Sequence, residues 1–149
     1  MARSANILLV EDDPNDAVLV RKAVQTTLAG IPVAVVSDGQ EAVNYLKGEG
    51  LYANRALYPF PDIVLLDLKM PLMDGFEVLR WIRKQPRLKR LPVVVLTGSV
   101  QERDVRLAYE VGANSYVIKP TGFTQLSDTM KTLGDFWLNA ARLPEAGPG

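Results

Sequence analysis

Five short apolar runs are the feature that most constrains the fold of this chain. They cover residues 7–10, 33–36, 63–66, 93–96 and 116–118, and they are rich in β-branched side chains. Within each run the apolar residues are continuous rather than alternating, which is typical of parallel strands that helices cover on both faces. A helical pattern follows each run. This alternation predicts an α/β fold, a doubly wound sandwich around a five-stranded parallel sheet.

The expected helices have recognisable ends. The first three begin at an aspartate whose side chain can cap the free amides of the first turn, namely Asp13, Asp38 and Asp74. We therefore leave these three acids out of the candidate site. The first helix is expected to end near Gly30, the fourth to cover 101–111 and end at Gly112, and the fifth to cover 123–141.

Composition narrows the class of protein. A length of 149 residues with 48% hydrophobic content suits one domain, which we place at 1–143, followed by a disordered tail over 144–149. Lys+Arg and Asp+Glu are balanced at 17 each, so no net charge favours nucleic acid or an anionic membrane. The chain has no cysteine, and its first apolar run is too short for a signal peptide or membrane span. We expect a cytoplasmic protein with protein partners.

Polar residues stand at the carboxyl ends of four of the five runs. They are Glu11, Asp12, Asp67, Thr97 and Lys119. In an open parallel sheet these ends meet at one edge, where ligands bind. Converging carboxylates repel one another, and a divalent cation resolves this. We expect Mg²⁺, or Mn²⁺ or Ca²⁺ in its place, with Asp12 and Asp67 as direct ligands, Glu11 acting through water, and the backbone carbonyl of Lys69 completing the shell.

The same residues suit phosphoryl chemistry. The carboxylate of Asp67 can attack phosphorus to give an acyl phosphate once the charge repulsion is cancelled. Lys119 can pair with Asp67 at rest and with a phosphoryl oxygen after transfer, and the hydroxyl of Thr97 can bind another phosphoryl oxygen. These three residues are the expected reactive set.

A conformational switch is expected behind this site. If Thr97 moves toward the new phosphoryl group, it vacates space that Tyr116 is the expected side chain to fill. The face that would respond is built from the helix at 101–111, the strand at 116–118 and the helix at 123–141.

Four motifs resemble the receiver domain of two-component response regulators. They are ILLVEDD at 7–13, LLDLKMPLMDG at 65–75, VLTG at 95–98 and SYVIKP at 115–120. The resemblance implies a flavodoxin-like (βα)5 fold with strand order 2-1-3-4-5. It also implies phosphotransfer from the phosphohistidine of a sensor histidine kinase to Asp67, in a phosphoacceptor that assists its own phosphorylation and dephosphorylation. A cis peptide before Pro120 is implied as well.

A narrower resemblance concerns single-domain regulators that are paired with bacterial phytochromes. It rests on the long insert before Pro61, on Thr121, and on Phe136 and Trp137 with the trailing Pro144. It implies a phytochrome as the kinase and a homodimer through the 101–141 face, which Tyr109 and Phe136 can support.

Several alternatives stay open at this point. A phosphohydrolase of the dehalogenase type needs a second acid two residues after the nucleophile, where this chain has Lys69. A flavodoxin-like cofactor carrier needs free amides in the first turn, which here is acidic. A phosphate sink, a relay intermediate or a degenerate receiver that only docks partners would share most of the motifs. The insert at 48–61 is either a partner-facing loop or an extended helix end.

Two further expectations concern the surroundings of the site. Lys69 and Ser99 flank the phosphoryl position, and neither offers an acid or a well-placed amide, so we expect slow loss of the phosphoryl group. The basic residues after the third helix are expected to form a solvated surface rather than a nucleic-acid site. They are Arg80, Arg83, Lys84, Arg87, Lys89 and Arg90.

Overall fold

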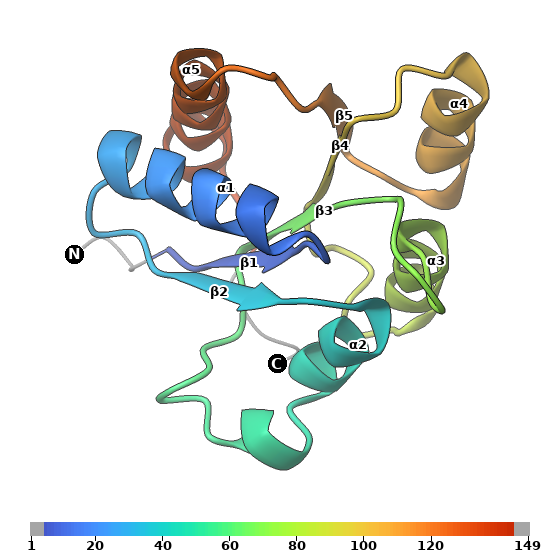
Figure 1. Ribbon diagram of the computed structural model, residues 1–149. Helices are drawn as coiled ribbons and strands as arrows, with labels where there is room; N and C mark the ends of the chain where they lie inside the picture. Colours follow the sequence, from blue (N-terminus) through green and yellow to red (C-terminus); the bar gives the residue numbers. More distant parts are fainter. Residues whose placement is uncertain (1–4, 145–149) are drawn as a thin grey trace.

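The computed structural model describes residues 5–144, which form a three-layer α/β sandwich around one sheet (Figure 1). The strands are β1 (Ile7–Val10), β2 (Val33–Val36), β3 (Ile63–Leu66), β4 (Val93–Thr97) and β5 (Ser115–Ile118). All pairings are parallel and the order is β2-β1-β3-β4-β5, which confirms the predicted topology. Only β4 and β5 depart from the predicted ranges, each by one residue, since Thr97 ends β4 and Ser115 begins β5.

Helices cover both faces of the sheet. They are α1 (Pro14–Thr27), α2 (Gly39–Lys47), α3 (Gly75–Lys84), α4 (Glu102–Val111) and α5 (Phe123–Gly134). Helices α1 and α5 lie on one face, and α2, α3 and α4 lie on the other (Figure 1). Helix α1 ends before the predicted Gly30, and α5 continues as a π-helical segment, Asp135–Ala140, that the sequence pattern did not distinguish.

The three predicted aspartate caps are present. The side chain of Asp13 accepts hydrogen bonds from the amides of Asn15 and Asp16. Asp38 caps α2, and Asp74 forms a reciprocal capping box with Glu77 at the start of α3. The three aspartates therefore have the capping role that the sequence predicts.

The unbroken apolar runs are explained by two core layers. In β1, Leu8 and Val10 pack under α2 and α3, whereas Ile7 and Leu9 pack under α1 and α5. Successive side chains of a strand point to opposite faces, so both faces of a doubly covered strand must be apolar. Burying each of these side chains contributes about 1.5–3 kcal/mol.

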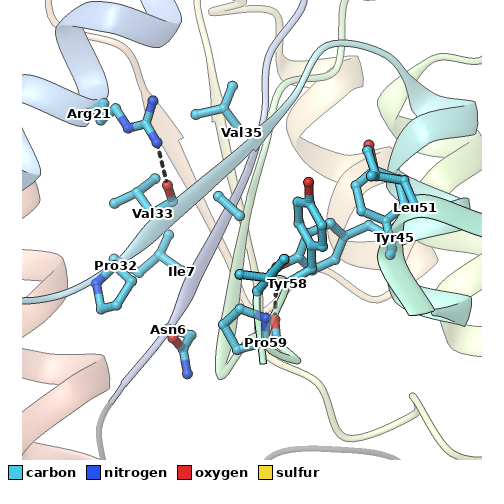
Figure 2. Close-up of a pocket in the computed structure, with 13 residues that line it drawn as sticks. Asn6, Ile7, Arg21, Pro32, Val33, Val35, Tyr45, Leu51, Tyr58 and Pro59 are labelled. Carbon is cyan, nitrogen blue, oxygen red and sulfur yellow. Dashed lines mark hydrogen bonds between the residues drawn. The ribbon is translucent and has the colours of Figure 1, made fainter. Parts of the chain in front are cut away.

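The insert at 48–61 packs against the end of α2, where Arg55 donates to the carbonyl of Leu46. Helix α2 ends at Gly48, whose φ of 71° is left-handed, so the alternative of an extended helix end is wrong. A short 3-10 helix, Gly50–Ala53, follows, and Tyr52 packs on Tyr45 with ring centroids 4.9 Å apart. A groove of about 400 Å³ lies between this insert and β2. Figure 2 shows Arg21 at one end of the groove, donating a hydrogen bond to the carbonyl of Val33.

Two expectations are wrong. Every peptide bond in the described part of the chain is trans, including the one before Pro120; the trans form is the lower in free energy even before proline, by about 0.5–1 kcal/mol. Arg83 does not belong to a solvated surface, because its guanidinium donates to the carbonyls of Leu91 and Gly112. Burial lowers the pKa of Arg83. This residue ties α3 to the turn after α4.

Two observations concern the limits of the fold. Within residues 5–144, no helix has both the length and the apolar character needed to cross a membrane. Of the tail predicted over 144–149, all but Pro144 lies outside the described residues.

Candidate functional site

Three carboxylates meet at the carboxyl edge of the sheet. Glu11 and Asp12 follow β1 and Asp67 follows β3, and these two strands are neighbours. One oxygen from each residue lies within 4.8 Å of the others. Glu11 and Asp67 are buried, at 2% and 6% exposure, whereas Asp12 is half-buried. The sheet thus brings together the acids that the sequence analysis grouped.

Lys119, from the end of β5, reaches three acids. Its ammonium lies 2.5 Å from Glu11 Oε1, 2.9 Å from Asp16 Oδ2 and 3.2 Å from Asp67 Oδ2. Burial by itself lowers the pKa of Lys119, but the hydrogen bonds to Glu11 and Asp16 reverse this and hold the pKa above its ordinary value. Lys119 therefore remains a cation at the centre of the acidic cluster.

Asp16 is a site residue that the sequence analysis missed. It stands in the first turn of α1, where an acid is expected simply for its favourable interaction with the helix dipole. Its position at the third residue of a helix that starts beside the acidic turn was the available signal. The first turn of α1 faces the carboxyl edge, and this brings Asp16 to Lys119.

The electrostatics of the cluster suit a divalent cation. The pKa of Glu11 is raised to about 7; burial is the largest cause, the hydrogen bond from Lys119 opposes it, and the charge of Asp67 adds to it. Three carboxylates with oxygens within 4.8 Å of one another concentrate negative charge, which a hard cation with oxygen ligands neutralises. Asp67 Oδ1 accepts a long hydrogen bond, 3.3 Å from the amide of Lys69. The donor set therefore fits a divalent metal ion.

Thr97 contributes a buried hydroxyl without a partner. The residue is 0% exposed at the end of β4, and its Oγ1 has no hydrogen-bond partner among the described residues. The amide of Lys119 donates to the carbonyl of Thr97 at 2.7 Å, which holds the two strand ends together. An unsatisfied buried hydroxyl costs about 1–3 kcal/mol, and an acceptor oxygen of a ligand would remove that cost.

Tyr116 is turned toward the loop between β4 and α4. Its hydroxyl donates to the carbonyl of Ser99 at 2.9 Å, and its ring packs beside Leu68 and Val95. Its own amide donates to the hydroxyl of Tyr109 on α4, 3.1 Å away. The side chain expected to act as a switch is thus hydrogen-bonded to the loop that follows Thr97.

The loop after Asp67 is folded tightly back on the acid. The amide of Gly75 donates to the carbonyl of Leu68 at 3.0 Å, and a Cβ at position 75 would lie 2.2 Å from the carbonyl oxygen of Asp67. Only glycine allows this approach. Leu72, at the tip of the loop, has a φ of 67° and is completely exposed.

A second missed residue is Asp104, which lies in the first turn of α4 and is buried. Its Oδ2 accepts a hydrogen bond from Ser99 Oγ at 2.5 Å and lies 3.1 Å from Lys69 Nζ. These contacts lower the pKa of Asp104, the Ser99 hydrogen bond most, against the opposing effect of burial. Ser99 and Lys69, which the sequence analysis expects to flank a phosphoryl group, therefore both contact one acid.

Comparison with known proteins agrees with this geometry. The family model of the response regulator receiver domain matches residues 7–131. Response regulator Rcp1 of Synechocystis sp. is 40% identical over 140 residues, which are 94% of this chain and 93% of Rcp1.

Two solved structures are also similar. The phosphorylated cyanobacterial phytochrome response regulator RcpA has a TM-score of 0.88 and 41% identity, over 96% of this chain and 100% of RcpA. The Mn(2+)-bound form of Rcp1 has a TM-score of 0.84 and 39% identity, over 95% of this chain and 99% of that one. The resemblance to receivers and to phytochrome response regulators is confirmed. The chain belongs to the response regulator receiver domain family.

Proposed function

We propose that Asp67 accepts a phosphoryl group from the phosphohistidine of a sensor histidine kinase. The observation that carries this proposal is the convergence of Glu11, Asp12, Asp67 and Lys119 on one position at the sheet edge. The orphaned hydroxyl of Thr97 beside them adds a donor for a phosphoryl oxygen. The phosphorylated state of the similar regulator RcpA supports the same chemistry.

The transfer forms one bond and breaks another. A carboxylate oxygen of Asp67 bonds to phosphorus, the phosphorus–nitrogen bond of the donor breaks, and its electron pair stays on the imidazole, which takes up a proton from solvent. Lys119 holds Asp67 Oδ2 at 3.2 Å, which orients the carboxylate, and its charge can then pair with a phosphoryl oxygen. The hydroxyl of Thr97 donates a hydrogen bond to a second phosphoryl oxygen.

The metal in this proposal is Mg²⁺. Asp12 and Asp67 would hold it directly, Glu11 would hold it through water, and the backbone carbonyl of Lys69 would be a further ligand. When bound, it supplies positive charge that offsets repulsion between the carboxylate and the phosphoryl oxygens. Mn²⁺ or Ca²⁺ can substitute, and the Mn(2+)-bound form of Rcp1 supports a site of this type.

The proposed response is a change of the face formed by α4, β5 and α5. Movement of Thr97 toward the phosphoryl group frees the space behind it, and Tyr116 leaves its hydrogen bond with Ser99 to enter that space. The hydroxyl of Tyr109 accepts a hydrogen bond from the backbone amide of Tyr116, so Tyr109 borders the moving side chain on the same face. Tyr109 and Phe136 are about half exposed and can contribute to a homodimer through this face and the C-terminal helix.

The proposed kinase is a bacterial phytochrome, and the proposed location is the cytoplasm. RcpA is a phytochrome response regulator, and the similarity covers nearly all of this chain. The chain is a phosphoacceptor that assists its own phosphorylation and dephosphorylation. A phosphate sink or relay would use the same site. A dehalogenase-type phosphohydrolase is disfavoured, because Lys69 stands where such an enzyme needs its second acid and is paired with Asp104.

Transfer of label from a kinase tests the proposal. A phytochrome histidine kinase, labelled with radioactive ATP, is mixed with the purified chain and Mg²⁺. We expect label on the wild type and on the Asp128→Asn control, whose exposed acid lies on α5 away from the site, and none on Asp67→Asn. Full labelling of Asp67→Asn would rule out Asp67 as the acceptor.

A further inference from the structure

We propose that Asp104 is a positioning residue that slows hydrolysis of the phosphoryl group on Asp67 by holding Lys69 and Ser99 away from it. The inference rests on the proposed function, because it concerns the lifetime of the aspartyl phosphate. It assigns a role to a buried acid that takes no part in the transfer described above.

The contacts of Asp104 join two loops that border Asp67. Lys69 lies in the loop between β3 and α3, and its ammonium is 3.1 Å from Asp104 Oδ2. Ser99 lies in the loop between β4 and α4, and its hydroxyl donates to the same oxygen at 2.5 Å. One carboxylate oxygen at the start of α4 therefore gathers the donors of both loops.

Burial makes this arrangement specific. The side chain of Asp104 is 8% exposed, whereas that of Lys69 is 56% exposed. A carboxylate removed from water needs its hydrogen bonds, so Asp104 retains both donors while the lysine side chain bends inward to meet it. The buried carboxylate of Asp104 therefore fixes the positions of the Lys69 ammonium and the Ser99 hydroxyl.

The Lys69 ammonium and the Ser99 hydroxyl both come from loops that border Asp67. The amide of Lys69 donates to Asp67 Oδ1 at 3.3 Å, so the lysine side chain starts from a residue in contact with the phosphoacceptor. Ser99 follows Thr97 by two residues, and its carbonyl accepts the hydroxyl of Tyr116. If either donor turned back toward Asp67, it would reach the outer side of the phosphoryl group, where water must approach.

Hydrolysis is the step that such donors assist. The oxygen of water bonds to phosphorus, the bond between phosphorus and the Asp67 oxygen breaks, its electron pair returns to the carboxylate, and a proton of the water passes to solvent. A free ammonium or hydroxyl at this position stabilises charge on the phosphoryl oxygens and orients the water. Asp104 keeps both groups engaged elsewhere, so the phosphorylated form lasts longer.

The test measures loss of label from protein phosphorylated in Mg²⁺ buffer. In Asp104→Ala, Lys69 and Ser99 are released, and we expect label to be lost about two- to fivefold faster than in wild type, the range of a partly exposed ion pair. Asp104→Asn retains the volume and an acceptor oxygen but loses the charge, and its rate should fall between the two. Thermal melting shows whether Asp104→Ala folds. If it does not fold, Asp104→Asn alone tests the proposal.

Coupling to the held residues separates positioning from a merely structural effect. Adding Asp104→Ala to a Lys69→Ala and Ser99→Ala double variant should leave the hydrolysis rate unchanged, because no donor remains to be released. The control is Glu102→Gln, which removes an exposed acid from the same turn of α4 and should hydrolyse like wild type.

The outcomes distinguish the two proposals. If the wild type takes label, and Asp104→Asn and Asp104→Ala both lose it at the wild-type rate, the role of Asp104 is overturned and the proposed function is not. An equal acceleration with and without Lys69 and Ser99 would also overturn the role of Asp104. A wild type that takes no label from kinase or from acetyl phosphate would overturn both this inference and the proposed function.

Discussion

Lys119 lies closer to Glu11 than to the proposed phosphoacceptor: its ammonium is 2.5 Å from Glu11 Oε1 and 3.2 Å from Asp67 Oδ2. The cation thus holds together the ends of β1 and β5 as well as orienting Asp67. This dual contact links the stability of the fold to the charge balance of the site.

Replacing Lys119 by Met should destabilise the protein by about 3 kcal/mol in metal-free buffer, because two buried carboxylates lose their counter-ion. Added Mg²⁺ should recover part of this loss, since a bound cation replaces the missing charge. Urea unfolding with and without Mg²⁺ measures both effects. The control is Lys131→Met, which removes an exposed lysine paired with the exposed Asp135 just after α5 and should change the free energy of unfolding little. Equal losses in the two variants would argue against the central position of Lys119.

Asp12→Asn should weaken binding of Mg²⁺ about tenfold or more, because a charged ligand becomes a neutral one. Asp13→Asn is the matched control in the adjacent position. Asp13 caps α1, and asparagine caps equally well, so neither metal affinity nor stability should change. Isothermal titration calorimetry of the three proteins gives the affinities. Similar weakening in both variants would contradict the assignment of Asp12 as a ligand.

Thr97→Val should raise the free energy of unfolding by about 1 kcal/mol, because the substitution removes a buried hydroxyl that has no partner among the described residues. The same variant should accept phosphate more slowly, since a donor to the phosphoryl oxygens is lost. Urea titrations and labelling time courses report the two quantities. Lower stability together with unchanged labelling would show that the hydroxyl is satisfied in another way.

Phe136→Ala should shift the protein toward monomer in sedimentation velocity if dimers use the C-terminal helix. The ring is 54% exposed and packs edge-on against Trp137, with centroids 5.1 Å apart. Removing it would take away the largest exposed aromatic surface of this segment. Leu51→Ala, at an exposed position in the insert beside β2, is the control and should leave the profile as in wild type. An identical profile for Phe136→Ala would count against this interface.

The strands and the gathering of polar residues at the carboxyl edge could be predicted because each depends on local sequence. Runs such as 7–10 must be apolar on both faces, and the residue that follows each run must lie at the carboxyl edge. Glu11, Asp67 and Lys119 were found in this way, and the structure places them within reach of one another.

The residues that were missed depend on how distant loops meet. Asp16 and Asp104 each stand in the first turn of a helix, where an acid has an ordinary local explanation. Arg83 has the same ambiguity at the end of α3. Their partners lie in other elements, and only packing of helices onto the sheet determines which side chains pair. The position of Asp16 beside the acidic turn was a sequence signal, but spacing gives none for the contacts of Asp104 and Arg83.

Asp67 as the phosphorylated residue is the centre of the proposed function. Phosphorylation by phosphoramidate in Mg²⁺ buffer, followed by mass spectrometry of the intact protein and of its peptides, measures this without a kinase. We expect the wild type to gain the mass of one phosphoryl group on the peptide that contains Asp67, and Asp67→Asn to gain none. A phosphoryl group on any other residue, or an equal gain of mass in Asp67→Asn, would contradict the account.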